Sequence, residues 1–233
     1  MCFSLHGNRT IASNLDTDDF VLWNSVLWPI LLGMKRARDP KATRNAILRA
    51  AFEKVHRQGF QAAGLGDILA ATEVTKGAFY HHFPSKMDLG YALVEEALGE
   101  YVRSWWLDPL EDSEDPIDGL ARIIQERLSS DIPRMIPLGC PLNNLAQEMA
   151  CADEGFRQRV ETLYRMWRKG LARALRRGQQ RDHVRADIDA DAAATFIVAS
   201  LEGAFGLAKN ANSLEVFQEC MGGLSHFLTS LRP

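Results

Sequence analysis

The chain has 233 residues, of which 46% are apolar and 24% are charged, a composition typical of globular proteins and unlike that of disordered or collagen-like chains. The formal net charge is -3, but the two signs are unevenly distributed. Residues 35–90 carry ten basic and five acidic side chains, whereas residues 91–233 carry 16 basic and 22 acidic ones. A basic unit therefore precedes an acidic one, and we expect an anionic partner for the first unit, with nucleic acid ahead of a membrane surface.

The cysteines show neither a disulfide framework nor a metal-binding pattern. Cys2, Cys140, Cys151 and Cys220 are too few to cross-link a chain of this length, and none of them lies in a CxxC or Cys/His ligand spacing. The sequence therefore predicts no metal site, no cofactor and a reducing, cytoplasmic location.

Residues 1–34 are predicted to be a loose extension that precedes a natural start at Met34. Their apolar run, residues 20–34, is shorter than the ~20 residues that a membrane-spanning helix needs, and it contains an asparagine, a serine and a proline. Three aspartates precede this run, where a signal peptide carries positive charge. We expect neither a membrane span nor a signal peptide here.

The basic unit, residues 35–90, has the pattern of three helices. Apolar residues recur at helical spacing over 43–58, with Thr43 as the predicted N-cap and Gly59 as the terminating glycine. A short helix starting at Leu65 and another over residues 75–82 are separated by a tight turn, which is the helix-turn-helix arrangement. Ser85 is then expected to cap a long helix over residues 86–106.

The acidic unit, residues 91–233, is predicted to be helical throughout. Apolar residues recur at helical spacing, and no segment shows the two-residue alternation of a strand. Helices are expected over residues 116–129, 141–150, 156–178, 192–209 and 214–231. The fold is therefore predicted to be all-α, with an N-terminal three-helix DNA-binding domain and a C-terminal helical domain for ligand binding and dimerisation.

The run from Ile68 to Lys86, ILAATEVTKGAFYHHFPSK, closely resembles the signature of the tetracycline-repressor family of bacterial transcription regulators. The resemblance extends back to Thr43 and forward into the fourth helix. It implies that the third helix enters the major groove of DNA. The residues that would contact DNA are Thr75, Lys76, Gly77, Ala78, Tyr80, His81 and Lys86.

The chemistry of these residues agrees with the resemblance. Small residues beside Lys76 allow close approach to the groove, and the lysine can reach a phosphate or a guanine edge. Tyr80, His81 and Lys86 match family positions that contact backbone phosphates, which fix register without reading sequence. Residues 63–66 depart from the family pattern of a Thr or Ser followed by a polar residue. One phosphate contact is therefore either absent or made by backbone amides.

The last two helices carry apolar and small residues on more than one face, so both sides of each helix must be covered. The resemblance implies that they pair with their copies in a second subunit as a four-helix bundle. Burial inside a monomer is the alternative. Two-fold symmetry suits DNA half-sites that lie ~34–36 Å apart.

The resemblance also implies a cavity for a small inducer in the C-terminal domain. Large residues that could line this cavity, and that could equally form plain core, are Trp105, Trp106, Met135, Met149, Tyr164 and Trp167.

The segments around residues 139–148 and 202–209 are similar to an electrophile-responsive branch related to the N-ethylmaleimide reductase repressor. By this resemblance Cys140 is the sensing thiol and Lys209 its cationic neighbour. A helix N-terminus and an ammonium group both lower a thiol pKa. Pro141 departs from the branch, and the alternative is that Cys140 is a small buried apolar residue.

The sequence therefore predicts a homodimeric, ligand-responsive repressor that binds a palindromic double-stranded DNA operator. A small molecule or a thiol-reactive electrophile is expected to release it, and no membrane partner is expected. One alternative is a helical-bundle enzyme using Glu148, Glu202 and Lys209, but the chain has no nucleophile–base pair, phosphate-binding loop or metal-ligand spacing. The other is an interaction protein whose DNA-binding unit has lost its function, suggested by Ala63, Gly64 and Gly66 at the start of the second helix.

Overall fold

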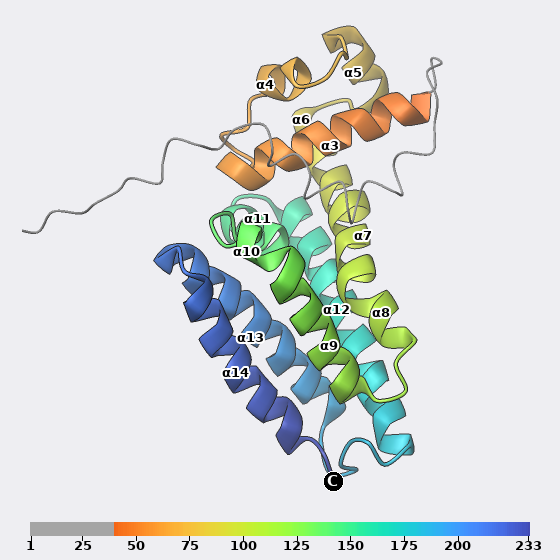
Figure 1. Cartoon of the computed structure of the whole chain (residues 1–233). Coiled ribbons are helices and arrows are strands. Elements are labelled where there is room, and N and C mark those ends of the chain that lie inside the picture. Colours follow the sequence, from red (N-terminus) through yellow and green to blue (C-terminus); the bar gives the residue numbers. More distant parts are fainter. Residues whose placement is uncertain (1–39) are drawn as a thin grey trace, which may run out of the picture.

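The computed structural model describes residues 40–233, which fold entirely into helices and connecting turns (Figure 1). An upper unit of one long and two short helices is joined to a larger helical body by one long helical run. The all-α prediction is confirmed for the described residues. The prediction that residues 1–34 form a loose extension lies outside them.

The upper unit contains α3 (Pro40–Gln58), α4 (Leu65–Ala70) and α5 (Lys76–His82). The prediction that Thr43 caps the first helix is wrong, because the helix already begins at Pro40, and proline fits the first turn. Gly59 ends it as predicted, with a φ of +87°. The core of this unit joins apolar residues of α3 to Ile68, Phe79 and Phe83, none more than 2% exposed.

One uninterrupted helical run connects the two units (Figure 1). It comprises α6 (Lys86–Ala92), the π-helical η2 (Leu93–Leu98), α7 (Gly99–Val102), the π-helical η3 (Arg103–Leu107) and α8 (Asp108–Glu111). Ser85 caps its start, because its side chain accepts a hydrogen bond from the Asp88 amide at 3.1 Å. The run extends beyond the predicted end at residue 106, because Pro109 occupies the first turn of α8, where proline is tolerated.

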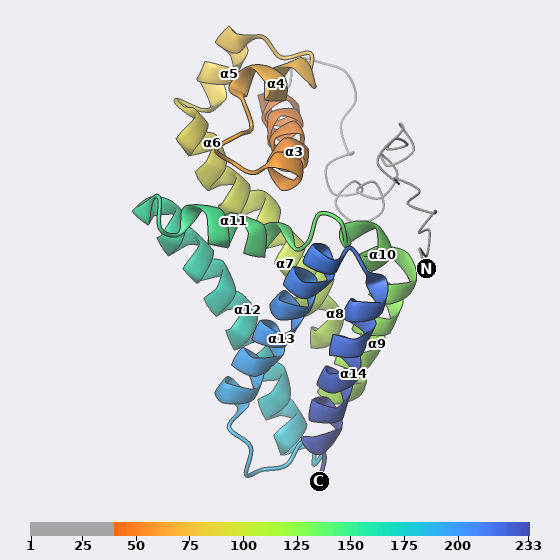
Figure 2. The same cartoon turned by 90° about the vertical axis from the view of Figure 1, so that its left-hand side faces the viewer.

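The helical body contains α9 (Pro116–Ser130), α10 (Ile132–Met135), α11 (Pro141–Met149), α12 (Glu154–Gln180), α13 (Ala190–Ala211) and α14 (Leu214–Ser230). All but α10 are predicted from the sequence. Aspartates cap three of these helices at Asp115, Asp153 and Asp189. The two last helices, α13 and α14, lie side by side, and α13 also packs against α12 (Figure 2).

Among the described helices, α13 has the length and apolar composition that would allow it to cross a membrane. Half of its most apolar window is buried inside the protein. Because it packs against helices on two sides, its composition is that of a core helix.

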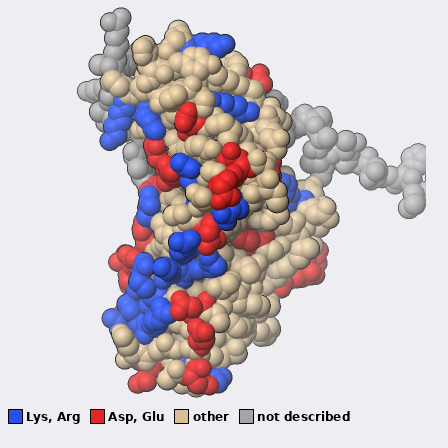
Figure 3. All heavy atoms as spheres, turned by 180° about the vertical axis from the view of Figure 1, so that it is seen from behind, with Lys and Arg blue, Asp and Glu red and all other residues tan. Residues whose placement is uncertain are grey.

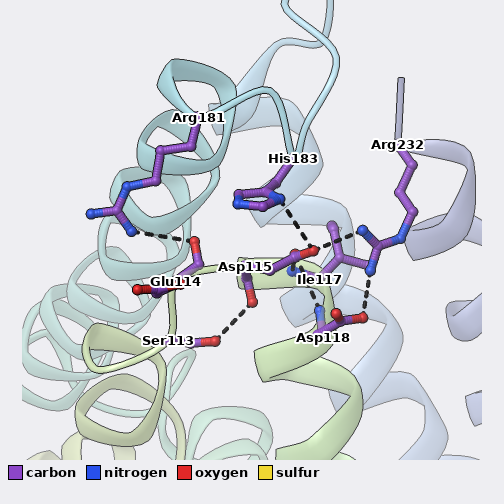
Figure 4. Close-up of polar contacts among 8 residues, drawn as sticks. All are labelled: Ser113, Glu114, Asp115, Ile117, Asp118, Arg181, His183 and Arg232. Atoms are coloured by element: carbon purple, nitrogen blue, oxygen red, sulfur yellow. Dashed lines mark hydrogen bonds and ion pairs between the residues drawn. The ribbon is translucent and has the colours of Figure 1, made fainter.

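The C-terminus is tied to the start of α9 by a polar cluster around Asp115 (Figure 4). The Asp115 carboxylate accepts from the Ile117 amide at 2.8 Å and pairs with the Arg232 guanidinium at 2.7 Å. His183, from the loop between α12 and α13, lies 3.6 Å from the same carboxylate. One side chain thus caps a helix and holds two distant segments against it.

Charge is also uneven within the acidic unit. Lys and Arg side chains gather over the lower half of the rear face (Figure 3). The helix α12 carries eight basic and only two acidic residues, so the excess of acidic residues lies elsewhere in the unit. Several of these arginines form ion pairs with carboxylates, among them Arg168 with Glu161 at 2.8 Å and Arg173 with Glu111 at 3.9 Å.

Candidate nucleic-acid interface and effector site

The N-terminal end of α5 is presented to solvent. Thr75 caps the helix, because its hydroxyl accepts a hydrogen bond from the Ala78 amide at 3.2 Å. Phe79 is fully buried and anchors the helix in the core of the upper unit. The anchor turns Thr75, Lys76 and Gly77 outward, and all three are exposed.

The outer face of α5 allows close approach by another molecule. A Cβ atom added to Gly77 would meet nothing within 4 Å. The Tyr80 ring packs edge-on against Phe79, with 5.2 Å between centroids, and 48% of Tyr80 is exposed. His81 is also exposed and Ala78 is half-buried. The surface therefore combines a cation, a phenol, an imidazole and small residues, as expected from the sequence.

Side-chain hydrogen bonds in the preceding turn fix the direction of α5. The Thr72 hydroxyl donates to the Leu69 carbonyl at 2.9 Å and accepts from the Val74 amide at 3.2 Å. The helix α4 begins at Leu65, and its N-cap residue, Gly64, provides no side-chain hydrogen bond. Ala63 is fully buried, which gives a packing reason for a small residue where the family pattern has a larger one.

Lys86 is held against the turn between α3 and α4. Its ammonium donates to the Gln61 carbonyl at 3.1 Å and lies 4.8 Å from the centre of the Phe60 ring. Partial burial lowers the pKa of Lys86, and the nearby Glu148 carboxylate opposes that shift. A phosphate contact by Lys86 would therefore be made from this position beside Gln61.

Glu148, near the end of α11 in the helical body, binds the same turn. Its two carboxylate oxygens accept hydrogen bonds from the Phe60 and Gln61 amides, both at 2.7 Å. Gly59 makes this possible, because a Cβ there would come within 2.9 Å of the carboxylate. Sequence reasoning missed this contact, since its partners lie 88 and 87 residues apart and no local pattern links them.

A second contact joins the units through His56. Its ring Nε2 lies 2.8 Å from the carbonyl oxygen of Gly139, so the neutral ring donates a hydrogen bond there. Burial lowers the pKa of His56 to about 4, and the charges of Lys209 and Arg57 act in the same direction, whereas the bond to Gly139 opposes them. His56 and Glu148 thus fasten the upper unit to the two ends of α11.

Comparison with known proteins identifies both units. Residues 47–93 match the family described as bacterial regulatory proteins, tetR family, and residues 116–222 match the tetracyclin repressor-like C-terminal domain. The transcriptional regulator AcuR of Cereibacter sphaeroides is 31% identical over 199 residues, which cover 83% of this chain and 89% of that protein. A crystal structure described as regulatory protein TetR from Rhodobacter sphaeroides superposes with a TM-score of 0.70 at 28% identity, covering 78% of this chain and 96% of that one.

The chain belongs to the tetracycline-repressor family of transcriptional regulators. It is accordingly a DNA-binding regulator and not an enzyme. The alternative interpretation of the sequence as a helical-bundle enzyme is therefore rejected. The transcriptional repressor NemR of Escherichia coli is 37% identical, but over only 59 residues, which cover 25% of this chain and 30% of NemR. The crystal structure described as the reduced form of Escherichia coli NemR nevertheless superposes with a TM-score of 0.70 at 23% identity, covering 81% of this chain and 96% of that one, so the similarity in fold extends well beyond this segment.

The residues that the sequence predicts to line an effector pocket all lie in the apolar core of the helical body. Trp105, Trp106, Met135, Met149 and Trp167 are each no more than 6% exposed, and Tyr164 is partly buried. The rings of Trp106, in η3, and Trp167, in α12, lie 5.4 Å apart.

Cys140 immediately precedes α11 and is 2% exposed. Its thiol donates to the Glu202 carboxylate of α13 at 3.4 Å. Burial and then the Glu202 charge raise the pKa of Cys140 well above its ordinary value, instead of lowering it as expected from the sequence. Burial likewise raises the pKa of Glu202 to about 7. The Lys209 ammonium donates to the Asn144 side chain at 3.1 Å.

Among residues 40–233 no group of three or more Cys, His, Asp or Glu side chains is placed to hold a metal ion. The three described cysteines are free thiols.

Proposed function

We propose that this regulator is a homodimeric cytoplasmic repressor that binds a palindromic operator and is released by a small molecule bound in its helical body. The observation that carries the proposal is the exposed end of α5. Lys76 and Tyr80 lie there beside small residues, which allow the helix to approach the base edges in the major groove. Members of the family that carry the word repressor in their names, such as NemR, support the direction of control.

On the operator, the small residues Gly77 and Ala78 let the α5 backbone approach the base edges. Lys76 then reaches a guanine edge or a phosphate, and Tyr80, His81 and Lys86 contact phosphates on either side. Most of the affinity comes from the phosphate contacts, so it falls steeply with salt.

The second subunit would cover the outer faces of α13 and α14. An exposed stripe of apolar and small residues runs along α13 at helical spacing, namely Ala192, Phe196, Ala199, Gly203 and Leu207. Phe196 and Leu207 are 50% and 59% exposed in the single chain. Gly203 and Gly206 in α13, and Gly222 and Gly223 in α14, have open space above them. Such a surface supports close helix packing between copies, and it argues against helices that are wholly covered within a monomer.

Of the two classes of effector expected from the sequence, the structure favours a reversibly bound molecule over a thiol-reactive electrophile. The reactive form of cysteine is the thiolate. At Cys140 both burial and the Glu202 carboxylate oppose its formation. Lys209 is hydrogen-bonded to Asn144, and Glu202 is the charged partner of the thiol.

The helix α11 offers a route from the effector to the DNA-binding unit. It starts beside the Cys140–Glu202 contact, and near its end Glu148 holds the Phe60–Gln61 turn. We infer that an effector which shifts α11 also rotates the upper unit, so that two recognition helices no longer match two half-sites.

The test is a gel shift with DNA flanking the gene and with a scrambled duplex as competitor. The full chain is expected to retain the flanking DNA at 50 mM salt and to lose at least tenfold in affinity at 200 mM. Equal retention of the scrambled duplex, or no retention at 50 mM salt, would contradict operator binding.

A further inference from the structure

The body of the regulator buries polar atoms that nothing in the described chain satisfies. The Tyr101 hydroxyl and the second carboxylate oxygen of Glu202 have no hydrogen-bond partner among residues 40–233. These residues are 1% and 7% exposed, so bulk water does not satisfy them either. Unpartnered buried polar atoms are costly, and an explanation by a bound group is the natural one.

These two atoms belong to a cluster of residues from α7, α12, α13 and the N-cap of α11. The other oxygen of the Glu202 carboxylate accepts a hydrogen bond from the Cys140 thiol at 3.4 Å. Burial raises the pKa of the phenols of Tyr101, in α7, and Tyr164, in α12, and electrostatic interaction with Cys140 and Glu202 raises it further. The thiol therefore contacts the carboxyl group of α13, and the two phenols are close enough to interact with its charge.

No described lysine or arginine neutralises this carboxyl group. Arg127, which acts on Tyr101, is already paired with Asp131 at 3.1 Å and lies 4.6 Å from the centre of the Trp105 ring. The Lys209 ammonium donates to Asn144. A buried carboxylate without a paired cation is costly, and the raised pKa of Glu202 reflects this cost, which a bound cation would offset.

We propose that Glu202, Tyr101 and Tyr164 form the binding site of a small organic amine in its ammonium form. The proposal rests on the proposed function, because this amine would be the effector that releases the operator. The ammonium donates to the free oxygen of Glu202 and to the Tyr101 oxygen, and aromatic rings beside it favour a cation. Binding is reversible, and Cys140 keeps its proton.

The chemistry excludes the neighbouring classes of ligand. An anion would meet the Glu202 carboxylate in a buried setting, where like charges repel strongly. A neutral alcohol of the same length leaves the carboxylate without a counter-charge. Because Glu202 has a pKa of about 7, amine binding strengthens between pH 6 and pH 8, where the carboxyl group ionises and simple alkylamines stay protonated.

The test is calorimetric titration of the full chain with n-butylammonium chloride, compared with n-butanol, sodium butyrate and sodium chloride. We expect butylammonium to bind at least tenfold more tightly than butanol or butyrate, and more tightly at pH 8 than at pH 6. Glu202→Gln is expected to weaken amine binding about tenfold, the loss of one charge-assisted contact. Tyr101→Phe, which keeps the buried ring, is a second variant and is expected to weaken it less. Cys151→Ser, which changes an exposed thiol outside this cluster, should bind as tightly as the parent chain.

Equal binding of butanol or butyrate, or undiminished amine binding by both Glu202→Gln and Tyr101→Phe, would overturn the amine site. The same protein preparations are tested for operator retention by gel shift. Retention without amine binding rejects the amine site alone, whereas loss of retention by the parent chain at low salt rejects the proposed function itself.

Discussion

At the scale of single residues, the proposed DNA-binding surface depends on a division between buried and exposed positions along α5. Phe79 is fully buried, while Lys76 and Tyr80 on either side of it are exposed. This division was predictable from the sequence, because helical spacing alone separates core from surface. It also means that the exposed residues can be changed without disturbing the fold.

Combining Lys76→Ala with Tyr80→Phe is expected to reduce operator affinity at least tenfold, because a cation and a hydroxyl are removed from the DNA surface. Gel shifts measure the affinity, and circular dichroism and light scattering check helicity and mass, which should stay unchanged. Lys169→Ala, an exposed lysine on α12, is the matched control. Wild-type affinity in the double variant would remove α5 from the interface.

Protonation of His56 at acid pH is expected to weaken the contact between the two units. Its pKa is about 4 in the folded protein and about 6.5 when unfolded, so the unfolded chain takes up a proton first as the pH falls. The stability from neutral His56 is therefore complete above pH 6.5 and is lost progressively down to pH 4. Urea unfolding at several pH values should show this slope, and His56→Gln should flatten it. An unchanged slope in the variant would contradict the assignment.

At the scale of secondary structure, local pattern predicted the helices and missed the contacts between them. Periodicity and capping residues placed α9 and α11 to α14 within a few residues of their observed ends. The four-residue α10 and the two π-helical segments were not predicted, because one helical turn carries no periodicity. The Glu148 and Glu202 contacts join distant segments, and only the fold brings them together.

Glu148→Ala tests the role of α11 as the link between the units. Removing the carboxylate leaves two backbone amides without their acceptor, and we expect a loss of about 1–3 kcal/mol in the free energy of unfolding. Amide hydrogen exchange at Phe60 and Gln61 should accelerate. Gln147→Ala, the exposed neighbour on the same helix, should change neither measurement. Unaltered exchange at both amides in Glu148→Ala would show that the two hydrogen bonds to Glu148 do not hold the Phe60–Gln61 turn.

At the scale of the whole molecule, the proposed function requires two copies of the chain. The apolar stripe on α13 is only partly covered within the described chain, and Gly203 and Gly206 leave room for a partner helix. The expectation of dimerisation came from family resemblance and from apolar faces. The sequence could not say which face lies outward, because that depends on how α13 packs against α12 and α14.

Gly203→Arg is expected to split the dimer, because it places a long cation on the proposed contact face while leaving the packing of the single chain untouched. Light scattering should give a mass near twice 26.1 kDa for the parent chain and near 26.1 kDa for the variant. Thr162→Arg, on the exposed side of α12, serves as control and should stay dimeric. A dimeric Gly203→Arg protein would place the interface elsewhere.

The most direct test of the central claim is a gel shift of the full chain on the DNA that flanks its gene, titrated against protein concentration and salt. The account predicts one specific complex that contains two chains, weakens steeply between 50 and 200 mM salt and is lost in the Lys76→Ala, Tyr80→Phe variant. Binding that ignores salt, or a specific complex that the double variant forms equally well, would contradict it.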